Sequence, residues 1–155
     1  MKSTDLSKSQ LTFLVLLRWL IGWHLLYEGL IKITNPAWSS KAYLASAEGI
    51  FGGIFQAMAQ SESLLRVVDY MNMWGLTIIG LALILGIFTT QFSIAGAILL
   101  LLYFLAHPPL FSPSPVAVEG SYLFVNKTLI ESCALVVLAL FPTAHIIGIQ
   151  RFFKK

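Results

Sequence analysis

Charged side chains are scarce in this sequence. They make up 11% of the 155 residues, against about 25% in a typical soluble domain, while hydrophobic residues make up 57%. A soluble protein of this length could not cover its surface with so few charges. The composition therefore excludes an ordinary soluble fold and predicts an integral membrane protein whose main solvent is the lipid bilayer.

Other absences exclude whole classes of chemistry. The single cysteine, Cys133, excludes an internal disulfide and a Cys-x-x-Cys redox pair. The chain has no Gly-rich phosphate loop, no nucleophile triad and no cluster of metal ligands. The net charge is +3, but the Lys and Arg residues are scattered, with several at the two termini. We therefore expect no bound metal and no nucleic-acid partner.

Four segments are apolar and long enough, or nearly so, to cross the bilayer, which takes about 20 helical residues. The first exceeds the apolar core of a signal peptide and carries ionisable residues, so we interpret it as a retained membrane helix. The third is short and can gain a turn from residues 89–90. We predict one all-α membrane domain over residues 1–155, a four-transmembrane-helix bundle. Its spans lie at about 11–33, 71–88, 91–106 and 122–141.

Two long connections join these spans. Residues 34–70 are too apolar for a solvated linker and are interrupted by glycines at 49, 52 and 53. We expect an interfacial or re-entrant helical segment there, followed by a helical lead-in over residues 62–70. The connection over residues 107–121 holds four prolines and predicts an extended, semi-rigid cover.

The distribution of Lys and Arg predicts the orientation. Both termini carry basic residues, whereas the proline-rich connection has no Lys or Arg. An even number of spans places both termini on one side, and the positive-inside rule assigns that side to the cytoplasm. We expect a multi-pass protein of the cell inner membrane whose two long connections face the periplasm.

Ionisable side chains inside a span cost several kcal/mol unless they are paired or hydrated, so each is a functional candidate. The first span has four of them: Arg18, His24, Glu28 and Lys32. At 100° per residue they fall within less than half of the helix circumference. The opposite arc has the character of a lipid-facing surface and carries Trp19, Trp23, Tyr27 and Leu30.

The last span begins with Asn126, Lys127 and Glu131, and His107 closes the third span on the same side. The first span runs outward and the last runs inward, so their charged residues lie at similar depth in the periplasmic half. We predict one polar pocket formed by these residues together with His24, Glu28 and Lys32.

Other interpretations of these residues remain open. Intrahelical Glu–Lys pairs could serve only to hold the first and last spans together. Arg18 lies nearer the cytoplasmic face and is more typical of a lipid-phosphate anchor. A haem held by His24 and His107 is a further alternative, although we expect no bound haem.

The order of several short stretches resembles the DoxX family, which includes the DoxD-like membrane subunit of thiosulfate:quinone oxidoreductase. The stretches are Leu17–Gly22 (LRWLIG), Tyr27–Lys32 (YEGLIK), Asn72–Gly86 (NMWGLTIIGLALILG) and Asn126–Glu131 (NKTLIE). The resemblance extends over about residues 11–141. It implies a four-helix membrane protein that is often encoded alongside a redox partner and, in the thiosulfate enzyme, electron transfer into the quinone pool. Nothing in this chain resembles a thiosulfate site.

The leading functional hypothesis is a membrane subunit of a quinone-linked oxidoreductase, with the redox cofactor on a periplasmic or peripheral partner. The candidate catalytic residues are His24, Glu28, Lys127 and Glu131. Of these, His24 and Glu28 could donate or relay protons, and Lys127 could hydrogen-bond a quinone carbonyl or stabilise negative charge. The candidate quinone-binding residues are Arg18, Lys32, His107 and Asn126. The main alternative is a non-enzymatic anchor or assembly factor, and the third hypothesis is a small-solute transporter. A homo-oligomer is compatible with each of the three.

Overall fold

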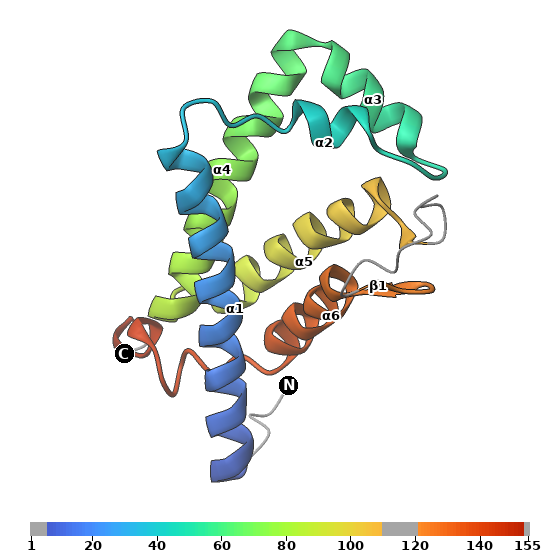
Figure 1. Ribbon diagram of the computed structural model, residues 1–155. Helices are drawn as coiled ribbons and strands as arrows, with labels where there is room; N and C mark the ends of the chain where they lie inside the picture. The colour runs from blue at the N-terminus through green and yellow to red at the C-terminus, as the bar shows by residue number, and fades with distance from the viewer. Residues whose placement is uncertain (1–5, 110–120, 154–155) are drawn as a thin grey trace.

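A computed structural model of the chain describes residues 6–109 and 121–153, and this part is mostly helical (Figure 1). The helices and strands are, in chain order, α1 (Lys8–Thr34), α2 (Lys41–Ala45), α3 (Gly52–Gln60), α4 (Glu62–Leu85), α5 (Thr89–Ala106), β1 (Ser121–Tyr122), β2 (Val125–Asn126), α6 (Lys127–Leu140) and the 3-10 turn η2 (Ile149–Phe152).

Three of the described helices, α1, α4 and α5, are long and apolar enough to cross a membrane. The first and third predicted spans agree with α1 and α5, and α5 does begin at Thr89. The predicted lead-in and second span form one continuous helix, α4, which ends where Gly86 adopts a left-handed conformation. The fourth span stays a prediction, because α6 has 14 residues and a rise of about 21 Å, against about 30 Å of hydrocarbon.

The predicted start of the last helix at Tyr122 is wrong. Ser121 and Tyr122 pair with Asn126 and Val125 in a short antiparallel hairpin, and the helix begins only at Lys127. The Asn126 side chain accepts a hydrogen bond from the backbone N–H of Leu129 at 2.9 Å. This N-cap satisfies one of the free donors of the first turn and fixes where α6 begins.

The helices pack as two pairs. In Figure 1, α1 crosses α4 along much of its length, while α5 and α6 lie beside each other and run off to one side. Glycines allow the close crossing of the first pair: a Cβ on Gly80 would lie 2.6 Å from the carbonyl oxygen of Gly22, and one on Gly29 would lie 2.6 Å from the backbone nitrogen of Thr77.

The second pair also has a direct backbone contact. Ser132 of α6 donates a buried hydrogen bond to the carbonyl oxygen of Ala97 in α5 at 2.9 Å. The apolar core lies between the two pairs and joins all four long helices; its most deeply buried members are Leu25, Leu76, Leu83 and Leu135. The expected lipid-facing arc of α1 is exposed, from 42% at Leu30 to 61% at Trp23.

Residues 34–61 form a cap over one end of α5. The backbone N–H of Glu48 donates to the carbonyl oxygen of Ala106 at 2.9 Å, and the Tyr43 hydroxyl donates to the carbonyl oxygen of Tyr103 at 3.0 Å. The helical segments expected there are α2 and α3, and their interfacial or re-entrant placement stays a prediction. The predicted proline-rich cover falls mainly on residues 110–120, outside the described residues.

Candidate functional site

His24 and Glu131 meet between α1 and α6. The Nδ1 atom of His24 lies 2.7 Å from Oε1 of Glu131. The Glu131 side chain is 15% exposed and that of His24 47% exposed, so the carboxylate is covered while the imidazole borders the outside of the helices. The expectation that ionisable residues of the first and last helices would come together is confirmed for this pair.

Glu28 and Lys32 form a second pair within α1. Lys32 Nζ lies 2.6 Å from Oε2 of Glu28, one turn along the same helix, and it also lies over the ring of Trp38 at 5.6 Å from the centroid. Glu28 lies one turn from His24 on the same side of α1. We call His24, Glu28, Lys32, Lys127 and Glu131 the polar layer.

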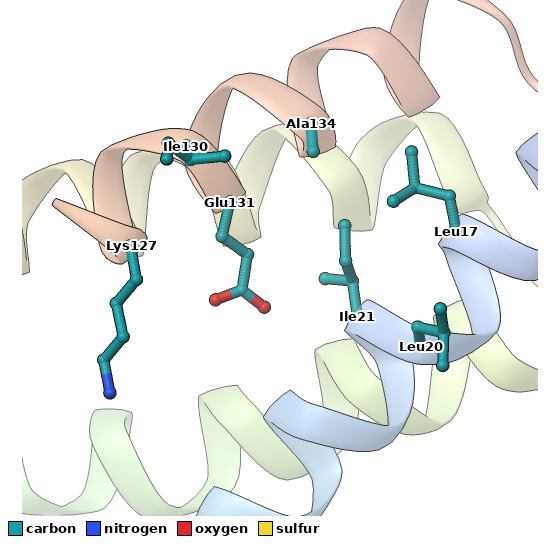
Figure 2. Close-up of a pocket in the computed structure, with 7 residues that line it drawn as sticks. All are labelled: Leu17, Leu20, Ile21, Lys127, Ile130, Glu131 and Ala134. Carbon is teal, nitrogen blue, oxygen red and sulfur yellow. The ribbon is translucent and has the colours of Figure 1, made fainter. Parts of the chain in front are cut away.

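A shallow groove opens between α1 and α6 beside this layer. It has a volume of about 340 Å³ and is lined by Leu17, Leu20, Ile21, Lys127, Ile130, Glu131 and Ala134. Figure 2 shows the side chains of Lys127 and Glu131 pointing from α6 into the space between the helices, with the leucines of α1 toward the other end. The groove is therefore apolar along most of its length and polar at one end.

The polar end could hold a ligand that has hydrogen-bonding oxygens. Lys127 is a donor with three N–H groups, and Glu131 accepts or, when protonated, donates. Lys127 forms no ion pair within residues 6–109 and 121–153. This arrangement can hold and move a proton and can place a positive charge beside a carbonyl oxygen.

Comparison with known proteins gives the family. The family model described as DoxX matches residues 13–108, more than half of the chain. The chain belongs to the DoxX family. The match includes most of α1 and all of α4 and α5. His24, Glu28 and Lys32 therefore lie inside it, whereas Lys127 and Glu131 lie beyond its end. No curated protein and no solved structure matches the chain.

The buried position of Arg18 in this DoxX protein contradicts the expected lipid-phosphate anchor. Its side chain is 1% exposed. Nη1 donates to Oγ1 of Thr143 at 2.9 Å, and Nη2 donates to the carbonyl oxygen of Ile147 at 2.8 Å. The reason is that the segment after α6 folds back beside the end of α4, where Gln150 N–H donates to the carbonyl oxygen of Gly86 at 3.0 Å.

His107 lies outside the polar layer. Its Nε2 is 2.9 Å from the carbonyl oxygen of Tyr43 and its ring packs against the Tyr43 ring at 4.3 Å between centroids. Partial burial raises the pKa of the Tyr43 hydroxyl to about 12, which keeps this group a donor toward α5. His107 thus connects the cap to α5. Its hydrogen-bond partner among the described residues is Tyr43, not the charged residues of α1 and α6 as predicted.

Asn126 also has a local role, as the N-cap of α6, although it stands directly beside Lys127. Within the described ranges no three His, Cys, Asp or Glu side chains gather to hold a metal. The two histidines considered for haem have different partners, Glu131 for His24 and Tyr43 for His107.

The sequence prediction missed one polar contact between spans. The hydroxyl of Tyr103 in α5 donates to Oδ1 of Asn72 in α4, and Asn72 Nδ2 donates to the carbonyl oxygen of Val68. The signal was available, since an asparagine in an apolar helix needs a partner. Its partner could not be read from the chain, because a tyrosine in a membrane helix more often marks an interface.

Proposed function

We propose that this DoxX protein is the membrane subunit of a quinone-linked oxidoreductase. It spans the cell inner membrane four times, with α6 as the fourth span and both termini in the cytoplasm. The cap formed by residues 34–61 faces the periplasm and docks the redox partner. The basic residues at the two ends and the absence of Lys and Arg from the proline-rich connection support this orientation.

The observation that carries the proposal is the polar layer itself. His24 and Glu131 lie 2.7 Å apart on different helices, and Lys127 and Glu131 both line the groove. Ionisable groups within membrane helices most often mark proton or substrate pathways. A groove with an apolar wall and a polar end suits a ligand that has a hydrogen-bonding ring and an apolar tail.

A quinone bound there accepts two electrons and two protons when it becomes a quinol. The described chain offers no redox centre of its own, so the electrons come from a flavin or nicotinamide cofactor on the partner. Lys127 donates a hydrogen bond to one carbonyl oxygen and stabilises negative charge on it. The His24–Glu131 pair supplies protons, and Glu28, one turn from His24, passes protons to that pair.

Quinone-dependent turnover of the complex purified from native membranes tests the proposal. We expect Glu28→Gln and Lys127→Met to lower turnover without loss of the partner from the complex. Arg66→Gln is the matched control, because Arg66 forms an exposed pair with Glu62 on the same protein. Unchanged turnover in both site variants would contradict the assignment.

A non-enzymatic anchor or assembly factor is the second candidate. The pairing of Glu28 with Lys32 inside one helix and of His24 with Glu131 between helices favours it, since both pairs would stabilise packing without any ligand. In that case the same substitutions lower the amount of folded protein in the membrane, and the activity per folded complex stays constant.

A further inference from the structure

The groove between α1 and α6 has one polar end and one apolar end. Lys127 and Glu131 lie at the start of α6, and His24 reaches Glu131 from α1. The rest of the lining consists of leucine, isoleucine and alanine, with Leu17 and Leu20 farthest from Lys127 (Figure 2). Leu20 and Ile130 are 60% and 59% exposed, so the groove opens sideways between the helices.

The charges at the polar end favour a neutral head group. Lys127 and Glu131, which carry opposite charges, both line the groove, and Glu131 is hydrogen-bonded to His24. Glu28 is paired with Lys32 one turn along α1. A phosphate or carboxylate head bound to Lys127 would be repelled by the negative charge of the Glu131 carboxylate, which lines the same groove. A neutral carbonyl or hydroxyl can accept from Lys127 and donate to or accept from Glu131 without that repulsion.

The apolar end sets the direction of the tail. The lining residues of α1 precede His24 in the chain, so Leu17 lies on the N-terminal side of His24, toward the end of α1 that the proposed orientation places in the cytoplasm. Ala134 follows Glu131 by one turn on α6 and lines the groove together with Leu17. Because the side chain of Ala134 is small, it leaves room in the groove that a larger side chain at this position would fill.

From this geometry we infer that the groove takes a neutral, carbonyl-bearing amphiphile directly from the bilayer through the gap between α1 and α6. The head lies at Lys127 and Glu131, and the isoprenoid or acyl tail runs past Ala134 and Leu17 toward the N-terminal half of α1. Under the proposed function, on which the identity of the head rests, the ligand is the quinone. The residues that select its tail are therefore those of the groove wall.

Photolabelling of the purified protein in lipid nanodiscs tests this directly. Two isoprenoid quinone probes are compared, one with the photoreactive group on the ring and one with it on the tail. We expect the ring probe to label the segment around Lys127 and Glu131, and the tail probe to label the segments around Leu17 and Ala134. Labelling spread evenly over the lipid-facing helices would overturn the inference.

Variants of the wall sharpen the test. Ala134→Phe fills the groove from α6 and Leu20→Trp fills it from the exposed side of α1, and each should lower labelling about tenfold or more. Leu20→Trp adds bulk outside the core, so it remains informative if Ala134→Phe fails to fold. Val136→Phe is the control, because Val136 is exposed on α6 and does not line the groove. Equal labelling of all three variants contradicts the inference.

Two further arms separate the possible ligands and proposals. A photoreactive phospholipid that labels the groove and is not displaced by quinone would overturn the neutral head group. Groove labelling by quinone without quinone-dependent turnover would retain this inference and refute the oxidoreductase proposal. If Leu20→Trp and Ala134→Phe keep full turnover and the probes label residues outside the groove, this inference is refuted and the oxidoreductase proposal is retained.

Discussion

Nδ1 of His24 lies 2.7 Å from Oε1 of Glu131, although 107 positions separate the two residues in the chain. The contact joins the α1–α4 pair to the α5–α6 pair at the level of the polar layer. The carboxylate is the more covered of the two groups. Removal of the imidazole would therefore leave a carboxylate facing apolar surroundings without its partner, which is costly inside a membrane.

A double-mutant cycle on His24→Ala and Glu131→Gln measures this contact. We expect a coupling free energy of about 0.6–1.7 kcal/mol for unfolding in lipid or detergent, the range found for hydrogen bonds between membrane helices. The Arg66–Glu62 pair is the control, because both side chains are largely exposed, and its coupling should stay near 0.3–0.5 kcal/mol or below. A coupling for His24 and Glu131 no larger than that of the control would refute the contact.

Two glycines of α4 provide a matched test of the α1–α4 crossing. A Cβ on Gly80 would lie 2.6 Å from the Gly22 carbonyl oxygen and 2.7 Å from Cα of Leu26, whereas a Cβ on Gly75 would meet nothing within 4 Å. Gly80→Ala should destabilise the protein by about 1–3 kcal/mol through overpacking. Gly75→Ala should be neutral or stabilising by up to about 1 kcal/mol. Thermal unfolding in detergent compares them, and similar melting temperatures would contradict the close crossing.

The hydrogen bonds of Arg18 predict how the C-terminal segment behaves. Arg18→Gln removes the donors that reach Thr143 and the Ile147 carbonyl, so residues 142–153 should come away from the end of α4. We expect faster backbone hydrogen exchange and faster proteolysis within that segment. Arg66→Gln, which removes an exposed guanidinium, should leave both rates unchanged. Equal protection of the segment in Arg18→Gln and the unmodified protein would show that Arg18 does not hold it.

Helical periodicity accounts for much of what could be predicted. The side of α1 that carries His24 and Glu28, and the exposure of the opposite side, follow from 100° per residue in a long apolar helix. The meeting of α1 and α6 follows from their antiparallel direction and the matching depth of their charges. Which acid pairs with His24 depends on the rotation of α6 about its own axis, and no local pattern encodes that.

The failures have specific physical causes. The hairpin that shortens α6 turns at Leu123, whose φ is +55°, and such turns are normally marked by glycine or asparagine. Arg18 was placed at the lipid because the segment that covers it lacks the periodicity of a helix. His107 was placed in the polar layer because the position of the cap depends on tertiary contacts such as that with Tyr43.

Infrared difference spectroscopy shows whether Glu131 exchanges a proton with the quinone. The protein in nanodiscs with bound quinone is compared before and after electrochemical reduction of the quinone. We expect a change in a protonated-carboxyl band that disappears in Glu131→Gln and persists in Glu62→Gln, since Glu62 is an exposed acid that does not line the groove. The absence of any carboxyl change, or a change that persists in Glu131→Gln, would contradict it.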